Sequence, residues 1–224
     1  MASMAAGGPP PTKYGVALFP GFQALDLFGP LDILNILSAS VPLQLSIMST
    51  TLDPVSTLAP SPSHRHPMVG QSIVPTHTFA TAPRDIQVLI VPGGRGTRDI
   101  AGTHPVVDYI RETYPRLRYI LTVCTGSVLL ARAGLLDGKR ATSNKSRFDT
   151  VVASAPQVDW IRRARWVTDG NFWTSSGISA GLDMTYAFVA QQYGPDIAKD
   201  IAWRSEYVWN SDPGNDPFAA PLRD

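Results

Sequence analysis

Residues 119–142 read YILTVCTGSVLLARAGLLDGKRAT, and this stretch carries the clearest strand-turn-helix pattern in the chain. A short run of apolar and β-branched residues ends at Cys124, then Thr-Gly-Ser follows and an Ala/Leu-rich segment begins. A short apolar run bounded by a turn is typical of a strand buried on both faces. The stretch therefore predicts a strand, a tight turn that carries Cys124, and a helix that Gly134 or Gly138 helps to end.

Strands and helices alternate on the amino-terminal side of this stretch. The strand candidates are YGVALF (14–19), LQLSIMS (43–49) and DIQVLIVPGG (85–94). The helix candidates are residues 20–37, whose apolar spacing indicates a helix entered through Gly29-Pro30, and PVVDYIRETY (105–114). Residues 51–79 are broken by Pro, Ser and Gly, which favours short antiparallel strands or a long surface excursion.

The alternation continues on the carboxyl-terminal side. We expect a strand at KRAT (139–142), helices within 145–155, 177–194 and 195–209, and a hairpin in 163–176 with its turn at Asp169-Gly170. Strands that alternate with helices indicate a mostly parallel sheet covered on both faces. The fold class is therefore α/β, a three-layer sandwich with an added antiparallel hairpin.

Composition sets the domain organisation and excludes several classes of protein. With 224 residues, 44% of them hydrophobic, the chain suits one large domain, which we place at 14–210 between a disordered leader (1–13) and an irregular tail (211–224). A net charge of +1 predicts neither a nucleic-acid nor a membrane partner. One cysteine, no spanning apolar run and no signal peptide predict a cytoplasmic protein.

Cys124 admits two interpretations. An unpaired cysteine is more often a small buried hydrophobe. At a strand-to-helix turn, however, its side chain would project from the sheet edge toward the positive end of the next helix, which stabilises a thiolate and lowers the pKa below its usual value of about 8.5. Ligands bind at the carboxyl ends of parallel strands, so the residues after 85–91 are expected beside Cys124.

Other polar clusters are weaker candidates. His64 and His66 offer two metal ligands with no third nearby, so neither a metal site nor a cofactor is expected. Arg162, Arg163 and Arg165 are predicted to lie on a solvated face.

Four segments together resemble the DJ-1/PfpI superfamily, and within it the isonitrile hydratase branch. They are LFPGFQALDLFGPLDIL (18–34), VLIVPGG (88–94), VCTGSVLLARAGLLDGKRAT (123–142) and GISAGLDMTYAFVA (177–190). The resemblance implies a flavodoxin-like sandwich and a homodimer with active sites near the subunit interface. The same domain forms the sensor half of some AraC-type regulators, but here the chain ends where a helix-turn-helix domain would begin, so an enzyme is expected.

The resemblance also implies roles for single residues. Cys124 would be the nucleophile and Asp26 the acid that faces it, although Asp26 could instead cap a helix before Gly29-Pro30. Thr125 follows the nucleophile where the peptidase-like members carry histidine, so amide hydrolysis is not expected. Asn144 stands where many bacterial relatives have histidine, which could change the substrate preference.

Further residues are expected to surround the substrate. The backbone N–H groups of Gly93, Gly94 and Thr125 could stabilise developing charge, or the two glycines could serve only a tight turn. Ile178 and Ser179 are candidate substrate contacts, although the small residues that follow Ile178 suit close packing at least as well.

We therefore expect a lyase (hydro-lyase) that adds water to an isonitrile through a Cys124 thioimidate, with Asp26 as general acid and base. The product would be an N-substituted formamide, and natural isonitriles associate such an enzyme with secondary metabolism. The alternatives are a glyoxalase-like or chaperone-like protein that acts on reactive carbonyls, and a redox sensor based on the oxidisable Cys124.

Overall fold

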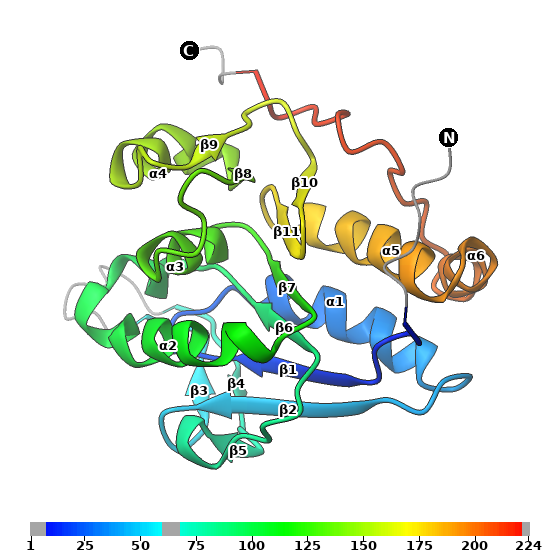
Figure 1. Cartoon of the computed structure of the whole chain (residues 1–224), viewed down its shortest axis with the longest axis horizontal. Helices are drawn as coiled ribbons and strands as arrows, with labels where there is room; N and C mark the ends of the chain where they lie inside the picture. The colour runs from blue at the N-terminus through cyan, green and yellow to red at the C-terminus, as the bar shows by residue number, and fades with distance from the viewer. Residues whose placement is uncertain (1–7, 60–67, 221–224) are drawn as a thin grey trace.

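A seven-stranded sheet in the order β10-β11-β7-β6-β1-β2-β5 forms the centre of the molecule (Figure 1). The computed structural model describes residues 8–59 and 68–220. The strands are β1 (Lys13–Ala17), β2 (Gln44–Ser49), β5 (His77–Thr78), β6 (Val88–Val91), β7 (Tyr119–Thr122), β10 (Trp166–Asp169) and β11 (Phe172–Ser175). All neighbours are parallel except the β10–β11 hairpin, which confirms the predicted sheet and its hairpin.

Helices cover both faces of this sheet (Figure 1). Three of them, α1 (Ala24–Leu37), α5 (Ala180–Tyr193) and α6 (Pro195–Arg204), pack together on one face. Helices α2 (Ile100–Thr113) and α3 (Gly126–Arg132) pack together on the other. Beside the sheet lies a smaller unit of β8 (Arg140–Ala141), α4 (Phe148–Ser154) and β9 (Asp159–Trp160), in which β8 pairs with β9.

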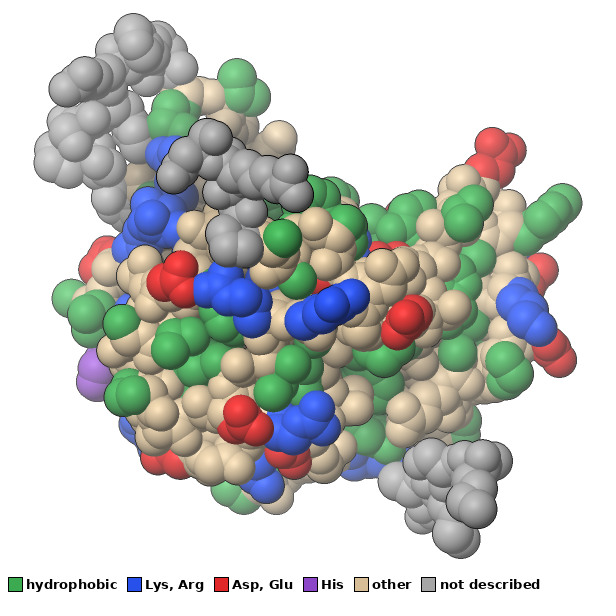
Figure 2. Space-filling model, turned by 90° about the horizontal axis from the view of Figure 1, so that it is seen from above, with side chains coloured by type: hydrophobic (Ala, Val, Ile, Leu, Met, Phe, Trp, Pro, Cys, Tyr) green, Lys and Arg blue, Asp and Glu red, His purple; other side chains and the backbone are tan. Residues whose placement is uncertain are grey.

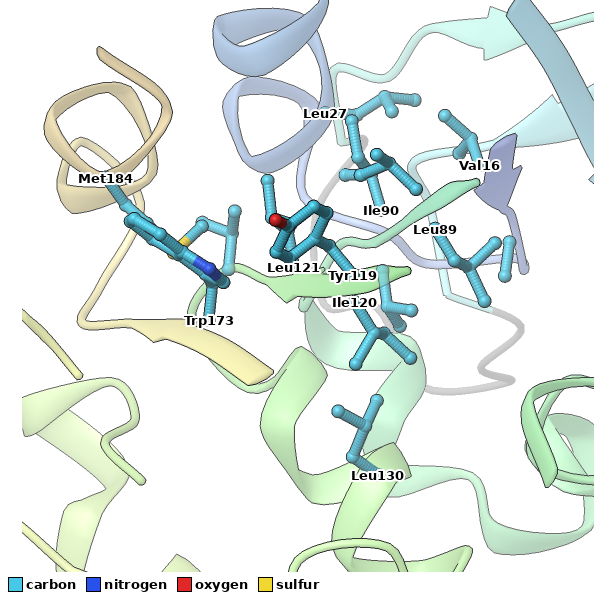
Figure 3. Packing of buried hydrophobic residues seen from close by; sticks show 14 of the residues in the cluster. Val16, Leu27, Leu89, Ile90, Tyr119, Ile120, Leu121, Leu130, Trp173 and Met184 are labelled. Atoms are coloured by element: carbon cyan, nitrogen blue, oxygen red, sulfur yellow. The ribbon is translucent and has the colours of Figure 1, made fainter. Parts of the chain in front are cut away.

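Burial on both faces explains why the central strands are continuously apolar. Every residue of β6 and β7 is buried. In Figure 3, Ile120 of β7 lies toward Leu130 of α3, while Leu27 of α1 lies near Ile90 of β6 on the other side. Fully burying one such side chain contributes about 1.5–3 kcal/mol, so these layers hold the loops at the strand ends in fixed positions.

Helix α1 begins earlier than the sequence predicted. It starts at Ala24, not at Gly29-Pro30, and Pro30 lies inside the helix. The extended Gln23 precedes the first turn, and the N–H of Asp26 donates to the Gln23 carbonyl at 3.1 Å. Because proline has no N–H, the Asp26 carbonyl lacks its usual helical donor, but the helix continues. Asp26 therefore lies in the first turn, and the prediction that it caps a helix before Gly29-Pro30 is wrong.

The described parts of this range, residues 51–59 and 68–79, contain the short strands that their composition predicts. Strands β3 (Val55–Ser56) and β4 (Ser72–Ile73) make a short antiparallel pair, and β5 adds a parallel edge strand beside β2. His64 and His66 lie outside the described residues.

Arg165 is buried, so the prediction that it lies on a solvated face is wrong. Its Nε donates to Asp183 at 2.8 Å, and its Nη1 lies 4.0 Å from Asp216. Lys145 Nζ lies 3.2 Å from the same Asp216 carboxylate. Opposite charges offset the desolvation of these cations, and Asp216 thereby fastens residues 211–220, which hold neither helix nor strand, to the domain.

The surface carries both signs of charge. On the face shown in Figure 2, basic and acidic side chains are interspersed with apolar ones. Among the described helices, none has the length and apolar character needed to cross a membrane.

Candidate active site

Three strand-to-helix connections bring the candidate residues together at the carboxyl ends of neighbouring strands. Asp26 follows β1, Gly93 follows β6 and Cys124 follows β7. The chain passes from β1 to β2 on one side and to β6 on the other, so β1 and β6 flank the topological switch point of the sheet. Open α/β sheets bind ligands at this point.

The turn at Cys124 is strained and tightly packed. Cys124 has φ 59°, in the left-handed region that non-glycine residues rarely adopt. A Cβ atom on Gly126 would lie 2.4 Å from the Val91 carbonyl oxygen, so only glycine fits the turn there. The Cys124 N–H donates to Ser176 at 3.0 Å, which ties the turn to the end of β11. Such strain persists where surrounding contacts determine the conformation, and it concentrates at functional sites.

Three nitrogen atoms face the Cys124 sulfur. Asn144 donates from Nδ2 to Sγ at 3.1 Å, and the Ser146 hydroxyl donates to Asn144 Oδ1 at 2.6 Å, which fixes the amide. The backbone N–H groups of Ile178 and Thr125 lie close enough to the sulfur to lower the pKa of the thiol. Ile178 itself has φ 40°, a second strained residue in the same site.

Asp26 lies behind Cys124 and has no exposed surface. The Gly93 N–H donates to its Oδ2 at 3.0 Å, whereas its Oδ1 has no hydrogen-bond partner among the described residues. Burial raises the pKa of Asp26 to about 7, and the Gly93 N–H and the Cys124 thiol oppose the rise only in part. The carboxyl group can therefore hold or release a proton near neutral pH.

The Cys124 thiol is not activated in the way the sequence predicted. Burial raises its pKa to about 12, the Asp26 carboxylate adds to the rise, and the three facing donors lower it too little to compensate. The helix end was expected to stabilise a thiolate, but desolvation and like-charge repulsion outweigh it. Cys124 and Asp26 consequently titrate as a coupled pair. Between pH values of about 7 and about 12, the two groups together hold one proton.

Gly93 and Gly94 are placed differently from the predicted oxyanion donors. The Gly93 N–H donates to Asp26, and the Gly94 N–H donates to Thr125 Oγ1 at 3.1 Å. A Cβ atom on Gly93 would lie 2.5 Å from the Thr125 nitrogen, so glycine is needed for close approach of the two loops. Both N–H groups are therefore occupied by contacts within the protein. Of the three predicted backbone donors, only the Thr125 N–H lies near the sulfur.

A cavity of about 460 Å³ opens onto Cys124, and we call it the Cys124 cavity. Cys124 is 6% exposed, which is enough for its sulfur to reach this space. Gly94, Thr125, Asn144 and Ile178 also line the cavity. Ser179 instead lines a neighbouring cavity, where its hydroxyl accepts a hydrogen bond from Arg165 at 3.2 Å.

The structure adds four arginines that the sequence analysis did not single out. Arg95, Arg98, Arg132 and Arg147 all line the Cys124 cavity. Two signals could have found some of them. Arg95 directly follows the predicted loop at Gly93-Gly94, and Arg132 lies seven residues after Thr125, on the same face of the predicted helix.

Within 8–59 and 68–220, no group of three or more His, Cys, Asp or Glu side chains is arranged to hold a metal ion.

The sheet has the flavodoxin strand order, a strained cysteine follows a central strand, and a buried acid lies beside it. These features are typical of one family of α/β proteins. The DJ-1/PfpI family model matches residues 13–191, and the chain belongs to this family.

Several known proteins are similar to the chain. Isonitrile hydratase of Pseudomonas putida is 36% identical over 199 residues, which cover 88% of this chain and 78% of the relative. The HTH-type transcriptional regulator GbdR of Pseudomonas aeruginosa is 29% identical, and the chain spans 53% of its length. A ThiJ/PfpI family protein from Pseudomonas syringae has a crystal structure with a TM-score of 0.74 and 32% identity, covering 91% of this chain and 77% of that one.

Proposed function

We propose that the protein is an isonitrile hydratase-like lyase that converts R–NC and water into the formamide R–NH–CHO. One arrangement carries the proposal: a nearly buried thiol lies beside a fully buried carboxyl group, and burial raises the pKa of both. Hydration of an isonitrile requires a soft nucleophile and a proton at the same carbon atom, which this pair supplies. The similarity to the hydratase of Pseudomonas putida supports the same reaction.

The first step adds sulfur and a proton to the terminal carbon. The shared proton resides on Asp26 in the reactive form, so Cys124 is a thiolate. Asp26 protonates the isonitrile carbon while the sulfur attacks it, giving the thioimidate R–N=CH–S–Cys124 and an Asp26 carboxylate. The Asn144 amide, with the N–H groups of Thr125 and Ile178, stabilises the thiolate before it attacks.

The second step returns the enzyme to its starting state. The Asp26 carboxylate takes a proton from water as the water oxygen attacks the thioimidate carbon, and Asp26 then gives this proton to nitrogen. The hydroxyl proton of the resulting R–NH–CH(OH)–S–Cys124 passes to Asp26 as the carbon–sulfur bond breaks. The products are the formamide, the Cys124 thiolate and protonated Asp26, so atoms and charges balance.

Thr125, rather than histidine, follows the nucleophile, and its hydroxyl is held by Gly94 and Thr97, so amide hydrolysis is not proposed. Carbonyl chemistry and redox sensing at Cys124 are distinguished from hydration by the assay described below.

A homodimer in the cytoplasm is part of the same proposal. Leu25, Phe28 and Leu45 are 41%, 46% and 40% exposed and line a shallow apolar depression with Leu182. Because Leu25 and Phe28 flank Asp26 in α1, a second copy that covered this surface would lie close to the active site.

The test is formamide production from cyclohexyl isocyanide, followed by mass spectrometry, for the wild type, Cys124→Ser and Asp26→Asn. We expect turnover by the wild type and a loss of at least about 1,000-fold in both variants, since each removes a group that reacts. An exposed acid between α3 and β8 provides the control, Asp137→Asn, which should keep its activity. Absence of turnover by the wild type, together with activity on a carbonyl substrate or peroxide, would overturn the proposal.

A further inference from the structure

Four cations line the Cys124 cavity. Arg95, Arg98, Arg132 and Arg147 contribute guanidinium groups, and among residues 8–59 and 68–220 no Asp or Glu lines the space. The whole chain has a net charge of only +1, so this concentration of positive charge is local. A concave surface lined by one sign of charge attracts ligands of the opposite sign.

These arginines have no carboxylate partner among the described residues. By contrast, Arg111, Arg165 and Arg204 each have an Asp oxygen within 4.0 Å. The side chain of Arg132 donates only to the Thr103 hydroxyl, at 3.3 Å. Arg84, Arg116, Arg118, Arg140 and Arg163 likewise have no ion-pair partner among the described residues, so this cavity differs in that four unpaired guanidinium groups line one space.

The four cations come from three separate segments. Arg95 and Arg98 lie in the 3-10 helix after β6, Arg132 ends α3, and Arg147 precedes α4. Burial and the neighbouring Arg147 and Arg95 lower the pKa of Arg98, and burial lowers that of Arg132. Like charges brought together by different segments repel one another, and a bound anion would relieve this repulsion.

The remaining wall suits a short, partly apolar linker. Val128, Val151 and Ile178 provide apolar surface, and Thr97 and Thr150 provide hydroxyl groups. A volume of about 460 Å³ lies at the small end of ligand cavities, which run from roughly 300 to 1,000 Å³. A small molecule could thus reach Cys124 with one end and the arginines with the other.

We propose that the substrate is an isonitrile that carries a carboxylate, an isocyano acid, with its isonitrile carbon at Cys124 and its carboxylate on the arginines. Arginine binds carboxylates through paired N–H donors, which fits this assignment. The product is then an N-formyl amino acid or a longer formamido acid, and the reaction remains the addition of one water molecule. The inference rests on the proposed hydratase function and adds the substrate class.

The test compares two substrates that share the isonitrile and differ in charge, isocyanoacetate and its methyl ester. We expect kcat/KM for the acid to exceed that for the ester by about tenfold or more, mainly through KM. The ratio of kcat/KM for the acid to kcat/KM for the ester should fall at least about fivefold in Arg98→Gln and in Arg147→Gln. It should stay unchanged in Arg204→Gln, which removes a guanidinium on α6 that pairs with Asp200.

A binding measurement separates this inference from the proposed function. N-formylglycine should raise the Tm of Cys124→Ala more than its methyl ester does, and Arg98→Gln should remove the difference. Preference for the ester, or a ratio that does not respond to Arg98→Gln, would overturn the carboxylate assignment while hydratase activity stands. If neither these compounds nor cyclohexyl isocyanide is hydrated, the hydratase proposal fails, and the assigned substrate fails with it.

Discussion

The raised pKa of Asp26 makes a quantitative prediction about folding stability. An ordinary Asp titrates near 3.8, whereas burial raises the pKa of Asp26 to about 7 in the folded protein. Between these values the folded state binds more protons than the unfolded state, so the free energy of unfolding falls as pH rises through this window. The full effect is about 4 kcal/mol, of which about 3 kcal/mol falls between pH 5 and 8.

Asp26→Asn removes this titration and keeps the shape of the protonated carboxyl group. Between pH 5 and 8, the free energy of unfolding of the wild type should fall by about 3 kcal/mol more than that of the variant. This corresponds to a difference of about 1 M in the urea midpoint. The assay is urea unfolding followed by tryptophan fluorescence at both pH values. Asp137→Asn, which removes an exposed carboxylate between α3 and β8, controls for other titrating groups and should follow the wild type.

Parallel pH profiles for wild type and Asp26→Asn would refute the reasoning. They would mean that Asp26 ionises in the folded protein as easily as in the unfolded chain. Its burial would then be offset by contacts stronger than the Gly93 N–H.

Three further predictions concern activity, thiol reactivity and stability. kcat/KM for an isonitrile should rise about tenfold per pH unit below about 7 and then level off, because below this pKa both Asp26 and Cys124 hold protons; a flat profile from pH 5 to 8 would contradict the shared proton. Asn144→Ala should slow alkylation of Cys124 by iodoacetamide at pH 8 by about tenfold, since it removes a donor 3.1 Å from the sulfur; an unchanged rate would show that the amide does not stabilise the thiolate. Asp216→Ala should lower the free energy of unfolding by about 3–5 kcal/mol, because Lys145, whose side chain is 5% exposed, loses its buried partner; a change below about 1 kcal/mol in urea unfolding would contradict this pairing.

The fold followed from the sequence because its signals are local. Apolar runs at 88–91 and 119–122 indicated strands buried on both faces, and Asp169-Gly170 indicated the hairpin turn. The start of α1 was misplaced because Pro30 normally begins a helix, whereas here it is tolerated within one.

The electrostatics of the site could not be read from the sequence in the same way. The position of Cys124 at a helix end predicted a low pKa, but the outcome depends on how deeply the sulfur and Asp26 are buried together. The positive charge of the Cys124 cavity likewise arises because arginines from separate segments meet in the folded chain, which the sequence alone does not show. Arg165 shows the same limitation, since its partners Asp183 and Asp216 are distant in sequence.

Two of the three donors that face the Cys124 sulfur belong to the main chain, at Thr125 and Ile178. Replacing either side chain leaves its N–H in place so long as the strained turns persist, whereas Val128, Val151 and the arginines line the cavity and are not among the groups that lower the pKa of the thiol. Substitutions that reshape the cavity should therefore change the pKa of the Cys124 thiol little, because two of its three donors are backbone N–H groups. A protein built in this way can evolve new substrate ranges while the environment of its sulfur is inherited unchanged.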